Sequence, residues 1–469
     1  MRSRSALAAT GGVVLVGLVA AGWASGLALG EPLPAAATSS AAAPVSAAST
    51  EAARTSTPTP TSTPKATAKP KAVARTCSVS GAARDARLVH FQGQVRNART
   101  GEVLFDRKGS KASRAASVMK VLTSAAALQV LGPDHRLTTR VVEGKRRGEI
   151  VLVGGGDVTL SRTPAGTRTA YAGAPHLSTL AKQVKRAWAA AHPGRPITRI
   201  VLDSSYFGGP TWQPTWNTKE RPLGSTPKIT ALMVDGDRAN PALNTSPRGT
   251  DPIGRAGSAF ASYFGGASVS RGVAPSGARV LGTVRSQPVS TLVQQELVVS
   301  DNTIAEALAR VTAIEAGTGK TFSSIDAAVI PALRTYGVEP KGVRVVDGSG
   351  LSDDNRIPPA YLTKLMVKVL HESKGLGPVL AGLPVAGRTG SLAYADRFAG
   401  AASRADGKVR AKTGWIDTGY TLSGIIRAKD GTPLTFAFYA LGNVSPSAKQ
   451  ALDSLTADVW SCGNRLSNR

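Results

Sequence analysis

Cysteine, histidine and aromatic residues are all scarce in this sequence. The 469 residues include 2 cysteines and 5 histidines, and Phe, Trp and Tyr together make up 5% of the chain. Without an HExxH pair or a cysteine cluster, we expect no metal site and no other cofactor. The hydrophobic content of 42% is nevertheless enough for most of the chain to fold, with a core of mainly small side chains.

Acidic residues are also few. The chain has 30 Asp and Glu against 57 Lys and Arg, which gives a formal net charge of +27. Such an excess favours association with polyanions. The sequence contains no recognisable nucleic-acid-binding module and no interleaving of basic and aromatic residues, so we expect no nucleic-acid partner. Anionic envelope polymers or a membrane surface are the expected partners.

The N-terminus is typical of an export signal. Basic residues at positions 2 and 4 precede an uncharged, largely apolar run from Ala6 to Gly30. Ala28-Leu-Gly30 offers a small-x-small cleavage site, but the run is also long enough to span a bilayer, which takes about 20 residues. Residues 1–30 are therefore either a cleaved signal sequence or an N-terminal membrane anchor. Both alternatives place the protein outside the cytoplasm, secreted to the envelope or anchored to the membrane.

Residues 31–76 contain almost no large apolar side chains and are rich in Ala, Thr, Ser and Pro. Such a segment cannot bury enough surface to fold, so we interpret it as a semi-extended linker. The two cysteines, Cys77 and Cys462, lie near the two ends of the remaining chain. In an oxidising compartment they are expected to form a disulfide, with two buried thiols as the alternative.

The pattern of helices and strands predicts an α+β fold that is interrupted by an insertion. We expect a hairpin over 88–107, a helix over 117–131, two helices around Ser300-Asp301 and antiparallel strands followed by a last helix at 447–460. Between them, short strand-like segments with one helical stretch indicate a β-rich insert. We assign 77–139 and 285–469 to one domain and 140–284 to the inserted domain.

Ser117-Val-Met-Lys120 opens an apolar run that has no helix breaker before Gly132. At a spacing of three residues on a helix, the two side chains share a face. A neutral lysine amine at that position can take the serine proton and activate the hydroxyl as a nucleophile. The alternative is a serine N-cap followed by a solvated lysine. Ser62 and Ser225 also precede a lysine by three, but in both cases an intervening proline disfavours the helix.

Two further motifs are weak alone and informative together. Ser300-Asp-Asn302 lies between two expected helices, where a tight turn can project its first and third side chains the same way, although such a tripeptide is more often a helix cap. Lys412-Thr-Gly414 lies on an expected strand that leads to Trp415. A cation and a hydroxyl on an edge strand can bind a peptide carboxylate.

Together and in this order, the three motifs resemble those of the serine penicillin-binding protein and β-lactamase superfamily. Further segments are similar to the class C low-molecular-mass penicillin-binding proteins, the D-Ala-D-Ala carboxypeptidases/endopeptidases with a large insertion after the Ser-x-x-Lys helix. These segments are Val153-Gly-Gly-Gly-Asp157 with Leu160, Asp347-Gly-Ser-Gly-Leu351 and Leu383-Pro-Val-Ala-Gly387. The resemblance covers roughly residues 80 to 465 and implies a penicillin-binding-protein transpeptidase-like domain.

The resemblance also implies a role for each motif residue. Ser117 would be the nucleophile and Lys120 its general base, with Ser300 and Asn302 assisting proton transfer and substrate positioning. The Lys412-Thr413-Gly414 strand would bind the substrate, its first two residues taking the terminal carboxylate. The backbone N–H groups of Ser117 and Trp415 would form the oxyanion hole. The implied substrates are peptidoglycan stem peptides and cross-links, with β-lactams as covalent inhibitors.

Asp353 stands where family members often have Arg, and the insert is shorter than in larger members, so the side-chain preference of the substrate site is open. Two other functions remain as alternatives. One is a β-lactamase on the same scaffold, which the lack of an obvious Glu-rich loop after the serine helix disfavours. The other is a catalytically silent wall-binding protein, which the presence of all three motifs disfavours.

Overall fold

The computed structural model describes residues 73–469, so the predicted export segment at 1–30 and most of the predicted linker lie outside it. Within the described residues, no helix combines the length and the apolarity needed to cross a bilayer. Helices and strands both contribute to three separate hydrophobic cores. This is the mixed α+β class that the sequence pattern predicts.

An antiparallel sheet near the C-terminus carries the Lys-Thr-Gly motif. Its strands are β9 (Val409–Ile416), β10 (Gly419–Arg427) and β11 (Pro433–Leu441), in the order β11-β10-β9. The hairpin of β2 (His90–Asn97) and β3 (Val103–Arg107) lies beside β11. The motif strand β9 is therefore an edge of this sheet, with backbone groups left free for a ligand.

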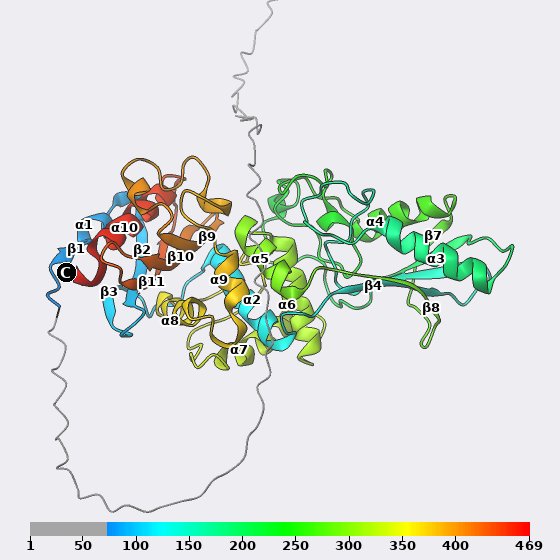
Figure 1. Cartoon of the computed structure of the whole chain (residues 1–469), viewed down its shortest axis with the longest axis horizontal. Coiled ribbons are helices and arrows are strands. Elements are labelled where there is room, and N and C mark those ends of the chain that lie inside the picture. The colour runs from blue at the N-terminus through cyan, green and yellow to red at the C-terminus, as the bar shows by residue number, and fades with distance from the viewer. Residues whose placement is uncertain (1–72) are drawn as a thin grey trace, which may run out of the picture. The chain divides into compact units, whose positions relative to one another are not determined.

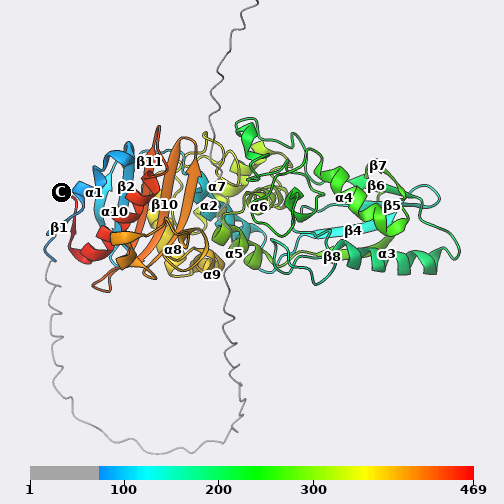
Figure 2. The ribbon, with the colours of Figure 1, turned by 90° about the horizontal axis from the view of Figure 1, so that it is seen from above.

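The strand β11 is buried on both faces. Phe436 and Phe438 pack in the core that includes α10 (Ala448–Cys462), whereas Ala437 and Tyr439 pack in the core that includes α8 (Pro359–Leu370). Successive side chains of a strand point to opposite faces, so this alternation places one helix on each side of the sheet. Figure 2 shows α8 and α10 on opposite sides of the strands.

The Ser-x-x-Lys motif lies at the start of a central helix. A 3-10 turn (Ala116–Val118) leads directly into α2 (Met119–Val130), in which every residue from Met119 to Leu128 is buried. A helix that is buried on all sides has to be surrounded by other elements. These neighbours are α5 (Val289–Val299), α6 (Asn302–Glu315), α7 (Ile325–Arg334) and α9 (Gly377–Gly382).

The β-rich insert forms a sheet of its own in the order β7-β6-β5-β4-β8. The strands are β4 (Thr138–Glu143), β5 (Glu149–Val153), β6 (Arg199–Asp203), β7 (Ser268–Arg271) and β8 (Val280–Arg285). The helices α3 (Leu177–Ala191) and α4 (Pro252–Ala261) connect parallel strands and share one core with the sheet. Figure 1 shows this sheet extending from α5 and α6 to the end of the molecule away from β10.

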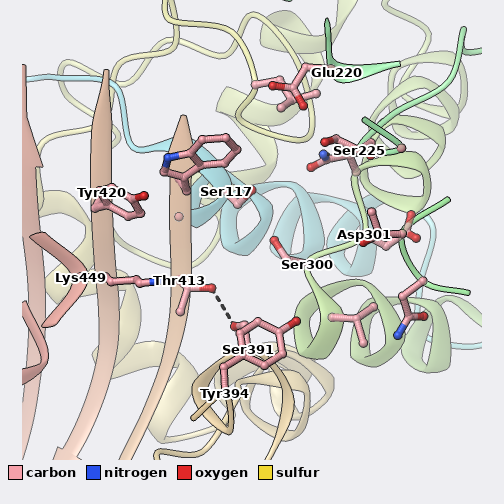
Figure 3. Close-up of a pocket in the computed structure, with 18 of the residues that line it drawn as sticks. Ser117, Glu220, Ser225, Ser300, Asp301, Ser391, Tyr394, Thr413, Tyr420 and Lys449 are labelled. Carbon is pink, nitrogen blue, oxygen red and sulfur yellow. Dashed lines mark hydrogen bonds between the residues drawn. The ribbon is translucent and has the colours of Figure 1, made fainter. Parts of the chain in front are cut away.

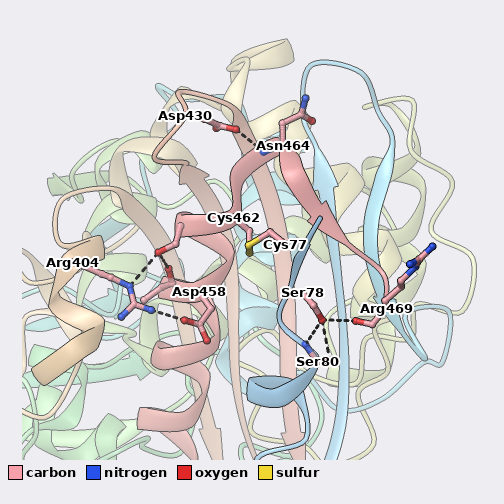
Figure 4. Close-up of a disulfide and its surroundings, with 11 residues drawn as sticks. Cys77, Ser78, Ser80, Arg404, Asp430, Asp458, Cys462, Asn464 and Arg469 are labelled. Atoms are coloured by element: carbon pink, nitrogen blue, oxygen red, sulfur yellow. Dashed lines mark hydrogen bonds and ion pairs between the residues drawn. A yellow bond between two sulfur atoms is a disulfide. The ribbon is translucent and has the colours of Figure 1, made fainter. Parts of the chain in front are cut away.

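The two ends of the described chain are fastened together. Cys77 and Cys462 form a disulfide, with their Cα atoms 5.4 Å apart. This confirms the predicted pairing and excludes the alternative of two buried thiols. Beside it, β1 (Cys77–Ser78) pairs in parallel with β12 (Leu466–Ser467), and the short helix α1 (Ser80–Ala83) follows. Figure 4 shows the disulfide between the start of the described chain and the end of α10.

Candidate active site

Lys120 is buried behind Ser117 at the start of α2. Its Nζ atom lies 2.9 Å from the Ser117 hydroxyl, 2.6 Å from Asn302 Oδ1 and 2.7 Å from the Ser349 carbonyl oxygen. The Lys120 side chain is 0% exposed, whereas Ser117 is half-buried and lines a cavity. The predicted pair thus meets on one helix face, with the hydroxyl towards the cavity.

The three partners of Lys120 can accept from an ammonium, and they also suit a neutral amine. Asn302 Oδ1 and the Ser349 carbonyl can only accept hydrogen bonds, and a neutral amine has two N–H groups to give them. Its lone pair is then left for the hydroxyl proton of Ser117. Burial lowers the pKa of Lys120 to about 8, against the opposing influence of nearby carboxylates, of which Glu296 is the strongest. About a tenth of Lys120 is therefore neutral near pH 7, far more than for a lysine with an ordinary pKa.

The Ser300-Asp-Asn302 motif forms the turn between α5 and α6. Ser300 has a left-handed backbone (φ 61°), and Asp301 caps α6 by accepting a hydrogen bond from the Ile304 N–H at 2.8 Å. The motif is therefore a helix cap and a site element at once. Asn302 gives its Oδ1 to Lys120 and donates through Nδ2 to the Ser225 carbonyl at 3.1 Å, which fixes the orientation of its amide.

Lys412 reaches from β9 to the same turn. Its Nζ atom donates to Ser300 Oγ at 2.8 Å and to the Thr413 carbonyl at 2.7 Å, and the side chain is 0% exposed. Burial, and then the charge of Lys120, hold the pKa of Lys412 well below its usual range. The neighbouring Thr413 hydroxyl is 2.7 Å from Ser391 Oγ, and Figure 3 shows both facing the cavity between β9 and the Ser300 turn.

Two glycines allow the backbone to pack closely around Ser117. A Cβ atom on Gly414 would lie 2.2 Å from Thr421 Oγ1, which itself donates to the Ala115 carbonyl at 2.7 Å. A Cβ atom on Gly350 would lie 1.9 Å from the Ala116 carbonyl oxygen. Any larger residue at either position would therefore displace the turn that carries Ser117.

The loop of Asp347-Gly-Ser-Gly-Leu351 is held from below by two buried carboxylates. Glu306 accepts hydrogen bonds from the N–H groups of Gly348 and Ser349, and Asp347 accepts from Gly350 N–H and Trp216 Nε1. Burial, and then the charge of Asp347, raise the pKa of Glu306 to about 8. These contacts fix the Ser349 carbonyl that faces Lys120, and they give the motif a structural purpose.

The residues converge on a cavity of about 380 Å³. Of the predicted site residues, Ser117, Ser300, Asn302, Thr413, Gly414 and Trp415 line it, and the two lysines lie buried behind it. Sequence reasoning missed several other lining residues: Glu220, Ser225, Ser391, Tyr394, Arg397, Tyr420 and Lys449. Asp353 does not line the cavity, and it accepts a hydrogen bond from the Thr418 hydroxyl at 2.9 Å.

Known proteins of one family match this sequence over most of its length. The pattern of the D-Ala-D-Ala carboxypeptidase 3 (S13) family matches residues 76–264 and 262–459. Carboxypeptidase DacB of Mycolicibacterium smegmatis is 37% identical over 393 residues, which cover 82% of this chain and 84% of that protein. Carboxypeptidase Rv3627c of Mycobacterium tuberculosis is 35% identical over 395 residues, which cover 83% and 84%.

The fold is similar to that of penicillin-binding protein 4 from Haemophilus influenzae. The two structures superpose with a TM-score of 0.67 at 18% identity, over 82% of this chain and 99% of that one. This confirms the predicted fold, a penicillin-binding-protein domain with a β-rich insert after the Ser-x-x-Lys helix. The chain belongs to the D-Ala-D-Ala carboxypeptidase 3 (S13) family.

Proposed function

We propose that this D-alanyl-D-alanine carboxypeptidase of the serine class acts through an acyl-enzyme on Ser117. The observation that carries the proposal is the set of partners around Lys120 Nζ, two pure acceptors and the Ser117 hydroxyl. When Lys120 is neutral, this arrangement leaves its lone pair for the proton that must be removed. Its substrates are peptidoglycan stem peptides or cross-links.

The proposed reaction begins when Lys120 takes the Ser117 proton as the Oγ atom attacks the carbonyl between the two D-alanines. The backbone N–H groups of Ser117 and Trp415 hold the oxyanion, as donors aimed at the developing charge. Thr413 and Lys412 bind the terminal carboxylate, Thr413 from the cavity wall and Lys412 from its buried position behind it. The C–N bond then breaks, and the proton that Lys120 took passes through the Ser300 hydroxyl, which Lys412 contacts, to the departing D-Ala amine. Water finally hydrolyses the ester.

Both substrate classes fit this chemistry. Attack on a free pentapeptide end releases D-Ala, which is carboxypeptidase action. Attack at a D-Ala carbonyl within a cross-link frees the other strand, which is endopeptidase action. Because Asp353 is bonded to Thr418 outside the cavity, the position where relatives often have Arg offers no cation to an acidic substrate side chain.

The test is intact-mass measurement after exposure to penicillin, followed by peptide mapping of the adduct. We expect one adduct per chain on the peptide that contains Ser117, none on Ser117→Ala, and normal labelling of Ser258→Ala, a change at an exposed serine of α4. A persistent adduct identifies a peptidase, whereas rapid loss of the adduct would favour the β-lactamase alternative. Labelling that survives in Ser117→Ala would refute the assignment.

We further propose that the insert binds anionic envelope polymers. Six exposed basic side chains lie at the end of its sheet: Lys145, Arg146, Arg147, Arg195, Arg199 and Arg279. Backbone hydrogen bonds join their segments, from Glu143 N–H to the Arg279 carbonyl and from Arg199 N–H to the Gly148 carbonyl. Among residues 73–469, none of the six forms an ion pair. With strands about 4.8 Å apart, they make a row of free cations.

An aromatic hollow adjoins this row. A pocket of about 330 Å³ is lined by Trp188, Tyr263 and Phe264 together with Lys185 and Arg195. The half-buried rings of Tyr263 and Phe264 can pack against sugar faces while the cations bind phosphate or carboxylate groups. An acidic glycan polymer therefore fits better than a lipid surface.

Sedimentation with isolated cell walls tests this partner. Replacing Lys145, Arg146 and Arg147 together by Ala should reduce binding and its salt dependence. A matched triple replacement of the exposed lysines Lys111, Lys364 and Lys429 should have a much smaller effect. Equal losses in both variants would show that only the net charge matters, and binding to anionic vesicles but not to walls would favour the membrane.

The family acts on the cell wall, so the chain acts outside the cytoplasm. We propose that residues 1–30 export or anchor the protein and that 31–76 serve as a linker with the reach to meet the wall. We also propose 77–139 and 285–469 as the catalytic domain and 140–284 as the inserted domain. The hydrogen bonds between Leu137 and Ser286, at the base of the insert sheet, support this division.

A further inference from the structure

A buried arginine of the insert contacts the middle residue of the Ser300-Asp-Asn302 motif. Arg238 Nη2 lies 2.6 Å from Asp301 Oδ2, and the two side chains are 1% and 4% exposed. The rest of the guanidinium donates to the Asp235 and Asn244 carbonyls and lies over the Tyr171 ring, 4.5 Å from its centre. Arg238 is thus held rigidly from several sides.

Asp301 connects this arginine to the catalytic turn. One carboxylate oxygen caps α6 through the Ile304 N–H, and the other binds Arg238. The adjacent Ser300 has a left-handed backbone, which is unfavourable for a residue with a Cβ atom and persists only where neighbours hold it. The ion pair between Arg238 and Asp301 stabilises this backbone, because Asp301 lies between Ser300 and Asn302 in the turn.

A second arginine of the same insert segment supports the other side of Asn302. Arg248 donates through Nε and Nη2 to the Gly224 carbonyl, at 3.1 and 3.0 Å. The next residue, Ser225, gives its carbonyl to Asn302 Nδ2. Arg248 also donates to the Gly236 carbonyl, in the turn that leads into Arg238. The insert therefore holds the catalytic turn at two points.

We propose that Arg238 is a positioning residue, through which the insert keeps Ser300 and Asn302 aligned with the two lysines during acylation. The inference rests on the proposed acyl-enzyme chemistry, because Arg238 would maintain the contacts of Lys120 and Ser300 on which that chemistry depends. Arg238 does not line the cavity and so acts through Asp301. The insert is then part of the catalytic machinery as well as a wall-binding module.

The test compares the full-length chain with Arg238→Gln in pre-steady-state acylation by penicillin. We expect the rate constant at saturating penicillin to fall by about 100-fold, the scale associated with a misplacement of about 1 Å in catalytic groups. The dissociation constant of the non-covalent complex should change by less than about 3-fold, because no binding contact is removed. If Arg238 had a purely structural role, Arg238→Gln would lower thermal stability without a selective loss in the acylation rate constant.

Two further variants separate positioning from folding. Arg238→Lys keeps a cation within reach of Asp301 and should recover most of the lost rate. Arg271→Gln removes an exposed ion pair of the insert, between Arg271 Nη2 and Asp251 Oδ1 at 2.6 Å, and should acylate at the wild-type rate.

The outcomes are distinguishable. If the wild-type chain forms no adduct on Ser117, the proposed function fails and the positioning role fails with it. If the wild-type chain is acylated and Arg238→Gln reacts as fast as Arg271→Gln, the positioning role alone is overturned. It is also overturned if Arg238→Lys, folded and thermally stable, reacts no faster than Arg238→Gln.

Discussion

Asn302 faces Lys120 with its oxygen, at 2.6 Å, and its amide cannot rotate without losing the Nδ2 bond to the Ser225 carbonyl. Lys120 therefore donates one N–H to Asn302 and another to the Ser349 carbonyl. Only one position on the nitrogen is left for Ser117. Whether that position holds a proton or a lone pair decides whether the serine can be activated.

The first prediction concerns the pH dependence of acylation. The proposed base is the neutral form of Lys120, and its pKa is lowered to about 8. We therefore expect the second-order rate constant for penicillin to rise about tenfold per pH unit below about pH 8 and to level off above it. Stopped-flow measurements across this range provide the check. A rate that is constant from about pH 6 to 9 would show that Lys120 is not the base.

The second prediction concerns Asn302→Asp. A carboxylate in place of the amide loses the donor to the Ser225 carbonyl and adds a negative charge beside Lys120, which favours the ammonium form. We expect the midpoint of the pH profile to move above about 8 and the rate near pH 7 to fall by at least about tenfold. Asn240→Asp, a change at an exposed residue of the insert, is the matched control and should leave the midpoint in place.

The third prediction concerns Gly414→Ala. A methyl group there would meet the Thr421 hydroxyl and the Ala115 carbonyl, at 2.2 and 2.9 Å, so β9 and the Ser117 turn would have to separate. We expect acylation to slow by about 100-fold, since small displacements of catalytic groups are costly. Gly81→Ala, where an added Cβ meets nothing within 4 Å, should react normally. Normal acylation of Gly414→Ala would show that the close approach is dispensable.

The elements that form the candidate site could be predicted because each motif has a local physical signature. A spacing of three on an unbroken helix brings Ser117 and Lys120 onto one face, and a tripeptide between two helical segments has to form a turn. The Lys412 strand was recognisable from its own pattern. The fact that these three segments meet came from the family resemblance, because no local pattern encodes contacts between residues nearly 300 positions apart.

The remaining contacts could not be predicted, mostly because they involve backbone atoms. The Ser349 and Ser225 carbonyls complete the surroundings of Lys120 and Asn302, and a carbonyl carries no residue-specific signal. The proline in the motif of Ser225 argues against a role as nucleophile, yet the Ser225 main chain lies at the site. Arg238 was one of many arginines in a basic chain, and only the fold shows it buried against Asp301.

The last prediction concerns the disulfide between Cys77 and Cys462, which closes a loop of 385 residues. Cross-linking the ends of so long a segment removes much of the freedom of the unfolded chain, so Cys77→Ser/Cys462→Ser should lose about 2–5 kcal/mol of stability. Cys462 ends α10, about 20 Å along the helix from Lys449 at the cavity, so the acylation rate should not change.

Thermal unfolding with and without reductant provides the measurement. Reductant should lower the Tm of the wild-type chain towards that of the double variant and leave the variant unaffected. Equal Tm values for both oxidised proteins would mean that the pairing of β1 with β12 already holds the ends together without the covalent bond.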